Sequence, residues 1–292
     1  MSVFAGRAGF VARCLTVLGT ALAAAGLADP AAQAALTCNT PGVALYHVDA
    51  LSQLRRWTYS SPLGSSSTWT QQLIGTGWSG LSLVSGGGGV LYAIDPSGNL
   101  RWYKDLDYAG GAQAWDPASG SVIGAGWNGF STVISGGGGV IYAVDSSGKL
   151  HWYRHLGSGS SSWAPNSGTV IGAGWNGASK LVAGGAGVLY TVSPSSVLSW
   201  YRHQDALGGT ASWASGGVPS RIGSGWSAFT GIESLGGGVL FAWDATGRLV
   251  WYLHNDPLGG SASWANAGVG VTAGTGWNDN PAATDITGCS AP

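Results

Sequence analysis

The feature that most constrains this chain is a unit of about 50 residues that is written five times. Its clearest copy spans residues 124–156 and reads GAGWNGFSTVISGGGGVIYAVDSSGKLHWYRHL, and the copy before it spans residues 78–106. Later copies begin at Trp175, Trp226 and Trp277, and the last is cut short by the end of the chain. A period of this length is typical of solenoids and propellers, so the repeat decides the fold.

Each copy alternates apolar and polar residues with the period of a β-strand. In the third copy VIYAVD and KLHWYRH flank the segment SSG, and this pattern predicts a hairpin. Asp145 and Gly148 stand at the first and fourth positions of its turn, which favour a capping side chain and a glycine. TVIGAGW and FSTVISGG supply a third and a fourth strand. Each unit is therefore predicted to be a four-stranded antiparallel sheet without helices.

Five such sheets fit blades set around an axis better than a solenoid, whose repeats are usually shorter. The predicted fold is all-β, a five-bladed β-propeller. Its hairpins are expected to begin near residues 43, 90, 140, 188 and 239. A glycine cluster precedes four of these hairpins, at residues 86–89, 136–139, 184–187 and 236–238. We expect these clusters where the innermost strand turns into the next, because a Cβ would crowd that turn.

The two ends of the chain are predicted to meet in the first blade. The first hairpin has no inner strand before it, whereas the last copy ends in ATDITGC, which aligns with FSTVISG of the third copy. We expect this C-terminal strand to complete the first blade. Cys38 and Cys289 then fall at the same turn, and we predict a disulfide between them.

Residues 1–34 have the pattern of a secretory signal peptide. Arg7 and Arg13 precede an apolar run, and an A-x-A cleavage pattern follows at residues 32–34. The run is shorter than the roughly 20 apolar residues that a membrane-spanning helix needs. We expect residues 35–292 to form a single secreted propeller that is monomeric.

The charge of the chain excludes two classes of partner. Charged residues make up 9% of the sequence and the formal net charge is −1, so no basic field attracts a phosphate backbone or an anionic membrane. Polarity comes instead from Ser, Thr, Asn and 52 Gly, with 16 Trp among them. We expect neither nucleic-acid binding nor membrane insertion, and we expect no cofactor.

Three segments match the dinucleotide motif GxGxxG, at residues 75–80, 124–129 and 172–177. In a Rossmann fold this motif opens a helix whose N-terminus meets the pyrophosphate. Here each match leads into another predicted strand. The motif is therefore interpreted as a structural turn and not as a nucleotide site.

One group of acidic residues suggests a catalytic alternative. Asp105, Asp107 and Asp116 cluster in the loop of the second copy, where they could bind Ca²⁺ or act as an acid–base pair, although loop Asp residues are usually only solvated. One histidine recurs at an equivalent position in three copies, and equivalent positions on separate blades lie too far apart for a metal triad. These residues are His155, His203 and His254.

Tryptophan recurs with the fold, since 15 of the 16 Trp residues form three sets of five. The first set lies in the second hairpin strand and is predicted to pack between blades. Its members are Trp57, Trp102, Trp152, Trp200 and Trp251. The second set follows a glycine and either packs between blades or forms the wall of a ligand site. Its members are Trp78, Trp127, Trp175, Trp226 and Trp277. The third set ends a small polar loop, where a ligand-binding role is favoured. Its members are Trp69, Trp115, Trp163, Trp213 and Trp264.

A neutral Trp beside small polar side chains suits a sugar ring, because the C–H face of the ring packs on the indole while its hydroxyls take hydrogen bonds. The Asn that follows some second-set Trp residues can donate and accept at once, which suits an N-acetyl group. These residues are Asn128, Asn176 and Asn278. We therefore predict a carbohydrate-binding site built from the second and third Trp sets and these Asn residues.

The order of these motifs resembles the tachylectin family of five-bladed propeller lectins: GxGW, a strand, a glycine-rich turn, GVLYAVD-like hairpins and a Trp that closes the polar loop. The resemblance covers essentially the whole chain after the leader. It implies binding of N-acetylglucosamine or N-acetylgalactosamine, with one site per blade between neighbouring sheets. Repeats one, two and four depart from the pattern at Trp57, Asp116 and Ser193, so one or two of the five sites are expected to be silent.

Three functions compete at this point. The leading hypothesis is a secreted multivalent lectin, not an enzyme, whose partners are glycans on cell surfaces or polysaccharides. The second is a secreted glycan hydrolase with a single site at the Asp cluster of repeat two. The third is a protein-binding scaffold, for which the sequence shows no unusually apolar face.

Overall fold

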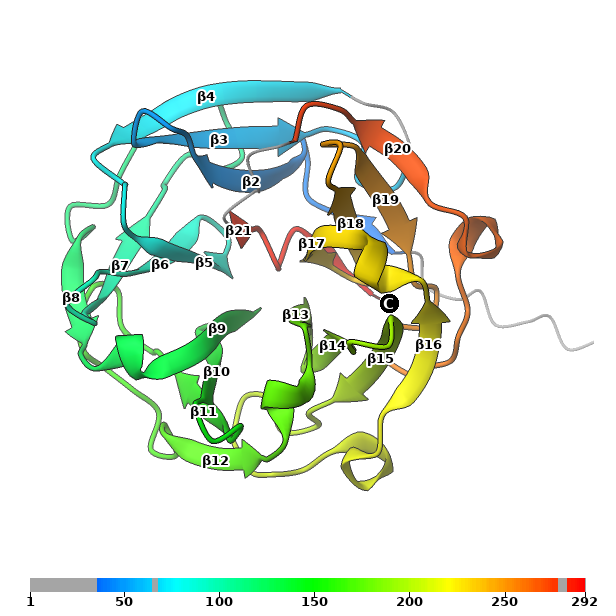
Figure 1. The fold of residues 1–292 in the computed structure, drawn as a ribbon. Helices are drawn as coiled ribbons and strands as arrows, with labels where there is room; N and C mark the ends of the chain where they lie inside the picture. Colours follow the sequence, from blue (N-terminus) through cyan, green and yellow to red (C-terminus); the bar gives the residue numbers. More distant parts are fainter. Residues whose placement is uncertain (1–35, 65–67, 278–282, 292) are drawn as a thin grey trace, which may run out of the picture. The chain divides into compact units, whose positions relative to one another are not determined.

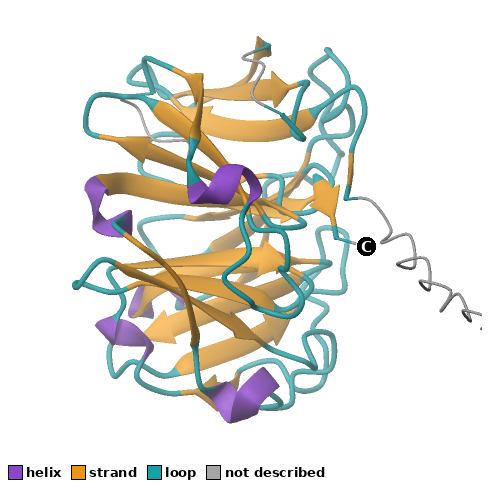
Figure 2. Ribbon diagram, turned by 90° about the vertical axis from the view of Figure 1, so that its right-hand side faces the viewer, coloured by secondary structure: helices purple, strands orange, loops and turns teal. Residues whose placement is uncertain are grey.

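The computed structural model describes residues 36–64, 68–277 and 283–291, which form five four-stranded antiparallel sheets in a ring (Figure 1). This arrangement confirms the prediction of an all-β five-bladed propeller. The predicted leader, residues 1–34, lies outside the described residues. Figure 2 shows that strands make up nearly all of the regular structure. Within the part of the chain that is described, no helix is long and apolar enough to cross a membrane.

We number the blades one to five in the order of their hairpins and give the strands of each blade from the axis outwards (Figure 1). Blade one contains β21 (Ala283–Thr284), β2 (Val43–Val48), β3 (Gln53–Tyr59) and β4 (Trp69–Thr76). Blade two contains β5 (Ser82–Gly87), β6 (Val90–Ile94), β7 (Leu100–Lys104) and β8 (Ser121–Gly124). Blade three contains β9 (Phe130–Gly137), β10 (Val140–Asp145), β11 (Leu150–Arg154) and β12 (Thr169–Gly172). Blade four contains β13 (Lys180–Gly185), β14 (Val188–Val192), β15 (Val197–Arg202) and β16 (Ser220–Ser224). Blade five contains β17 (Phe229–Gly236), β18 (Val239–Asp244), β19 (Leu249–Leu253) and β20 (Val271–Gly274).

The remaining elements are short. The strands β1 (Thr37–Cys38) and β22 (Cys289–Ser290) pair with each other outside the blades. The helices are single 3₁₀ turns: η1 (Trp127–Gly129), η2 (Trp175–Gly177), η3 (Ala214–Gly217), η4 (Trp226–Ala228) and η5 (Ala265–Gly268).

The core is divided into layers between neighbouring blades, because each blade is covered on both of its faces. Alternate residues of β10 show this most clearly. Ile141 and Ala143 pack against Tyr92 of blade two, whereas Tyr142 on the opposite face packs against Leu189 of blade four. A strand with two buried faces needs apolar residues at every position, which explains why this part of the repeat is the most hydrophobic.

The turn from the innermost strand to the next requires glycine. Gly137, Gly138 and Gly139 have φ angles of 80°, 60° and 83°, a left-handed region that residues with a Cβ rarely adopt. A Cβ on Gly139 would also collide with the carbonyl oxygen of His155. The backbone N–H of His155 donates to the carbonyl oxygen of Gly139 at 2.9 Å, so this turn is tied to the loop that follows β11.

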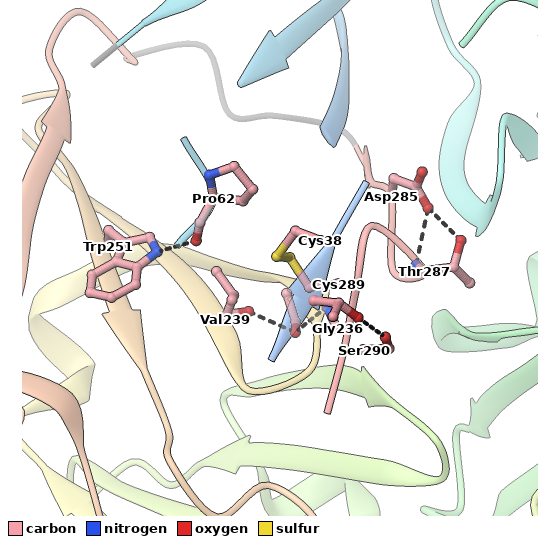
Figure 3. The surroundings of a disulfide bond; sticks show 11 residues. Cys38, Pro62, Gly236, Val239, Trp251, Asp285, Thr287, Cys289 and Ser290 are labelled. Carbon is pink, nitrogen blue, oxygen red and sulfur yellow. Dashed lines mark hydrogen bonds between the residues drawn. A yellow bond between two sulfur atoms is a disulfide. The ribbon is translucent and has the colours of Figure 1, made fainter. Parts of the chain in front are cut away.

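The ring is closed by the C-terminal segment. β21 pairs antiparallel with β2 and supplies the inner strand that blade one lacked, which confirms the predicted closure. The predicted disulfide between Cys38 and Cys289 is present and links β1 to β22 (Figure 3). The Asp285 carboxylate anchors the same segment, because it accepts a hydrogen bond from the backbone N–H of Gly88 in blade two at 3.1 Å. The N-terminal and C-terminal ends of the propeller are thus joined to each other and to the next blade.

Blade one corrects the predicted first Trp set. In the other blades the set pairs with the central aromatic residue of the preceding strand, for example Trp102 with Tyr92. The residue that pairs with the equivalent Tyr46 is Arg56, and Trp57 lies one position further along the strand, on the opposite face. Trp57 therefore does not occupy the position of the other four members, although it still packs against the core between blades five and one, with its ring centroid 5.3 Å from that of Trp277. Alignment of the repeats by their Trp residues places Trp57 at the core position, which its neighbour in sequence occupies.

Arg56 is 1% exposed and replaces the core Trp by a network of hydrogen bonds. Its Nη1 lies 2.7 Å from Oδ2 of Asp105, in the loop of blade two, and it also donates to the carbonyl oxygen of Asp107 at 2.6 Å. Asp105 is equally buried and stands where blades three to five have the recurrent His. The two differences from the repeat thus occur together at one blade interface, where the residues form an ion pair.

The acidic cluster of repeat two has structural partners. Asp105 forms the ion pair with Arg56, Oδ2 of Asp107 accepts from the backbone N–H of Ala112, and Oδ1 of Asp116 accepts from that of Ala118. Among the described residues, no group of three or more His, Cys, Asp or Glu side chains is close enough to hold a metal ion. These contacts favour the structural interpretation of the three carboxylates over the Ca²⁺ or acid–base alternative.

Candidate functional site

The second and third Trp sets meet in pairs at the interfaces between successive blades. Each second-set Trp follows the outer strand of one blade, and the third-set Trp that approaches it belongs to the loop of the next blade. The ring-centroid distances are 5.8 Å for Trp78–Trp115, 5.9 Å for Trp127–Trp163, 5.5 Å for Trp175–Trp213, 5.7 Å for Trp226–Trp264 and 4.8 Å for Trp277–Trp69. Every candidate site is therefore shared between two blades.

A hydrogen bond fixes each third-set indole against the preceding blade. Trp213 of blade four donates from Nε1 to the carbonyl oxygen of Ile171 on the outer strand of blade three at 2.7 Å. The corresponding distances are 2.7 Å for Trp115–Ile74, 3.1 Å for Trp163–Ile123, 2.7 Å for Trp264–Ile222 and 2.9 Å for Trp69–Ala273. Its only polar atom is therefore engaged, so the half-buried ring can contact other groups only through its carbon atoms.

The second-set indoles are mostly core residues. Trp78, Trp127, Trp226 and Trp277 are at most 8% exposed, whereas Trp175 is only half-buried. A glycine three residues earlier gives room for each ring: a Cβ on Gly172 would lie 2.5 Å from Nε1 of Trp175. Of the two roles left open for this set, packing accounts for four members, and Trp175 has a surface that a ligand can reach.

A third aromatic ring, which was not predicted from the sequence, completes each interface. It comes from the residue after the core Trp, which points to the opposite face of the strand. In blade four this is Tyr201, whose ring centroid lies 4.8 Å from that of Trp175 and 6.4 Å from that of Trp213, nearly perpendicular to the latter at 77°. The equivalent residues are Tyr103, Tyr153, Tyr252 and, in blade one, Trp57. The recurrent Trp-Tyr pair in the repeats was the signal for this ring.

The predicted Asn residues lie beside the aromatic corner and cover a glycine of the hairpin turn. A Cβ on Gly148 would lie within contact of the Asn176 amide, and Gly98 has the same relation to Asn128. Both side chains are exposed, and neither is hydrogen-bonded to the three rings. Asn278 lies outside the described residues.

A cavity of about 400 Å³ opens at the interface of blades three and four, which we call the 3/4 site. Trp175, Tyr201 and Trp213 form its aromatic side. Thr191 and Ser199 contribute hydroxyl groups, and no charged residue is among its lining residues. Burial raises the pKa of Tyr201, so its hydroxyl remains a hydrogen-bond donor across the physiological pH range. The site offers flat apolar rings and neutral polar groups together.

A second cavity, of about 450 Å³, lies at the interface of blades five and one. Trp57, Trp69 and Trp277 line it. Unlike the 3/4 site it contains charges, since Nε of Arg55 lies 2.7 Å from Oδ2 of Asp49. The hydrogen bond from Arg55 lowers the pKa of Asp49, so this carboxylate is ionised at neutral pH.

The recurrent His residues hold neighbouring blades together. Nε2 of His203 lies 2.7 Å from the carbonyl oxygen of Thr210 and must donate to it, so Nδ1 accepts from the hydroxyl of Tyr142 in the preceding blade at 3.1 Å. Burial lowers the pKa of His203, which keeps the ring neutral. His254 has equivalent bonds, and these contacts account for the conserved spacing of the His set within the repeat.

The GxGxxG segments run from an outer strand into the inner strand of the next blade, through a 3₁₀ turn in the second and third matches. In the third match, residues 172–177, the backbone N–H of Trp175 is bonded to the carbonyl oxygen of Gly148 at 3.0 Å. The helix η2 that follows has only three residues. This geometry differs from a Rossmann fingerprint, as the sequence analysis expected.

Comparison with known proteins identifies one family. The family model described as Tachylectin matches residues 48–281. No curated protein matches the chain. Among solved structures, a symmetrical protein that emerged de novo under folding constraints is 20% identical with a TM-score of 0.53, and the match covers 86% of this chain and 98% of that one.

Two further structures superpose less closely. A fucose-recognising six-bladed lectin from Aleuria aurantia is 16% identical with a TM-score of 0.42, over 82% of this chain and 76% of that one. Prp20p from Saccharomyces cerevisiae is 11% identical with a TM-score of 0.38, over 76% of this chain and 59% of that one.

Proposed function

Because this chain belongs to the tachylectin family, we propose that it is a secreted lectin that binds neutral, N-acetylated hexoses between successive blades and carries out no chemical conversion. The observation that carries this proposal is the uncharged corner of Trp175, Tyr201 and Trp213 beside the cavity of about 400 Å³. Cavities of roughly 300–1,000 Å³ are the usual size for small-molecule sites.

The chemistry of the corner fits a pyranose. One face of such a ring carries axial C–H groups and packs on an indole or phenol ring, while its edge carries hydroxyls. At the 3/4 site the aromatic faces of Tyr201 and Trp213 meet nearly at a right angle, so a sugar can touch one ring with its face and the other with its edge. The hydroxyls of Thr191 and Ser199 lie among the lining residues and can both donate and accept.

An N-acetyl group also has a place in this arrangement. Its methyl group is apolar and suits the aromatic corner, whereas its amide needs one donor and one acceptor. Besides the hydroxyls, the backbone of Gly216 and Gly217 lines the same cavity. These groups support the proposal of N-acetylglucosamine or N-acetylgalactosamine over a sugar that is recognised through charge.

Two features support the proposed location and mode of action. The leader pattern of residues 1–34 and the disulfide between Cys38 and Cys289 both fit an extracellular protein. A monomer with more than one site binds a glycan-bearing surface more tightly than a free sugar, by a factor of about 10² to 10⁴. We propose polysaccharides or cell-surface glycans as the partners.

The proposal is tested by a glycan array followed by calorimetric titration of the best monosaccharide. We expect N-acetylated hexoses to bind and Trp213→Ala to weaken binding at least about tenfold, which corresponds to about 1.4 kcal/mol. Leu156→Ala is the matched control, because Leu156 is 54% exposed on a loop and does not line the 3/4 cavity. Absence of binding across a broad array would refute the proposal, and turnover of any glycan would refute its non-enzymatic part.

A further inference from the structure

The interfaces between blades have the same three aromatic rings. They differ in the residue that lies three positions after the second-set Trp, after a Trp-Xaa-Gly or Trp-Ser-Ala segment. This residue, which we call the gate residue, lies at the start of the inner strand or one or two residues before it. It is Leu81, Phe130, Ala178 and Phe229 in blades two to five. The equivalent residue of the seam between blades five and one lies outside the described residues. The sequence motif thus repeats while the gate residue varies from a methyl group to a benzyl ring.

Where the gate residue is Phe, its ring packs into the aromatic corner. The Phe130 centroid lies 5.6 Å from that of Trp127 and 6.0 Å from that of Tyr153. Phe229 repeats this arrangement, at 5.6 Å from Trp226 and 5.9 Å from Tyr252. The ring therefore occupies space next to two of the three rings that would receive a ligand.

A second position varies together with the gate residue. It lies on the second hairpin strand, two residues before the Tyr of the corner. At the interface of blades two and three it is His151, whose ring lies 5.5 Å from Phe130 and whose Nε2 is 2.9 Å from Oδ2 of Asp145. At the interface of blades four and five it is Val250, which is 3% exposed. These side chains are larger than Ser or are buried against their neighbours.

Among the interfaces whose gate residue is described, the 3/4 site has the smallest side chains at both positions. Ala178 is the gate residue and Ser199 is the second one, and both line the cavity of about 400 Å³. The Trp175 indole beside them is only half-buried, whereas its counterparts Trp127 and Trp226 are 4% and 5% exposed. Loss of the benzyl ring therefore coincides with an open cavity and with an accessible indole.

We infer that the gate residue decides which interfaces bind sugar, and that Ala178 together with Ser199 makes the 3/4 interface a site for neutral saccharides. This inference rests on the function proposed above and gives it a location. At the interfaces where the gate residue is Phe130 or Phe229, the phenyl ring of that residue occupies the space beside the other aromatic rings. The five blades therefore share one architecture, but we expect fewer than five of their interfaces to bind sugar.

The test uses the full chain after the leader and N-acetylglucosamine or the best array hit as the probe. Ala178→Phe is expected to remove the 3/4 site and to lower the measured affinity at least tenfold or the stoichiometry by one. The matched control is Ala245→Phe, because Ala245 is exposed in the hairpin turn of blade five, away from the 3/4 cavity. In the opposite direction, Phe130→Ala with His151→Ser transfers the small pair to the interface of blades two and three and should add one site.

A readout without sugar separates this inference from the proposed function. Acrylamide quenching of Trp fluorescence should decrease in Ala178→Phe, because Trp175 loses its access to solvent, and should not change in Ala245→Phe. Sugar binding and quenching that are both unaffected by Ala178→Phe would overturn the inference and leave the lectin proposal intact. If the wild-type protein bound no sugar while quenching still decreased, the lectin proposal and the sugar-binding part of this inference would both fail, and only the control of solvent access to Trp175 by residue 178 would stand.

Discussion

Replacing Arg56 with Met should destabilise the propeller by about 3–5 kcal/mol, the usual cost of removing one partner of a buried ion pair. The side chains of Arg56 and Asp105 are 0% and 1% exposed, and Nη1 and Oδ2 lie 2.7 Å apart. Without the guanidinium group, the Asp105 carboxylate would keep a weak contact with the Tyr46 hydroxyl, at 3.5 Å, and the backbone N–H of Asp107, at 3.2 Å. Neither contact carries a compensating charge.

The destabilisation should depend on pH with a definite sign. Burial already raises the pKa of Asp105 above its ordinary value, while the hydrogen bond and charge of Arg56 oppose this rise. Removing Arg56 raises the pKa further, so the folded state holds a proton that the unfolded state has lost. Stability of Arg56→Met is therefore greatest below the unfolded pKa of about 4 and falls as the pH rises towards the folded pKa.

The other blades supply the compensating variant. Arg56→Trp with Asp105→His introduces the residues that stand at these two positions at the interface of blades three and four, Trp152 and His203, so the double variant should be less destabilised than the sum of its single changes. We expect a coupling energy of at least about 2 kcal/mol from the resulting double-mutant cycle.

The assay is equilibrium unfolding in urea with the disulfide intact, read at several pH values and accepted only where the m-value is unchanged. Arg101→Met is the control, because Arg101 is 34% exposed in its ion pair with Asp95 and such pairs contribute about 0–1 kcal/mol. The reasoning is refuted if Arg56→Met costs no more than Arg101→Met, or if the two single changes are additive.

Three further predictions follow from the scaffold. Cys38→Ser with Cys289→Ser should lower the free energy of unfolding by up to about 5 kcal/mol, because the cross-link spans 251 residues of sequence, and a change below about 1 kcal/mol in urea unfolding would contradict this chain-entropy estimate. Gly139→Ala should lower the midpoint of thermal unfolding strongly, whereas Gly129→Ala, at a position with open space around it, should not; equal effects would show that the turn tolerates a Cβ. Glu233 lines a cavity between the inner strands of the blades, where burial raises its pKa to about 8, so stability should fall as the pH rises from about 4.5 to 8. Glu233→Gln should remove that pH dependence in unfolding experiments, and an unchanged profile would argue against the assignment.

The repeat made most of the fold predictable. Strand alternation, turn residues and the leftover C-terminal segment were enough for the blade count, the closure and the disulfide, because each rests on a local pattern that recurs in frame. Blade one was harder, since Arg56 and Trp57 are adjacent and only cross-strand pairing decides which of them enters the core. Arg56 can be assigned to the core only when its ion-pair partner is known. That partner, Asp105, lies 49 residues away in the sequence.

The candidate site was predictable in part. The Trp sets were visible as repeats, but sequence spacing did not say that Trp127 meets Trp163 of the next blade rather than Trp115 of its own. Tyr201 was overlooked because it stands beside a more conspicuous Trp, although alternation along the strand places the two on opposite faces. The gate residue Ala178 belongs to no motif, and its significance comes from the space that it leaves unfilled.

The interface of blades five and one, where the ring closes, links ligand binding to completion of the fold. Nε1 of Trp69 reaches across it to the carbonyl oxygen of Ala273, which is 204 residues distant in sequence. A site shared by the first and the last blade exists only when the circle is complete. Ligand binding at this interface would therefore report on ring closure. A chain in which every blade had folded but the first and last blades were not joined would still lack this one site.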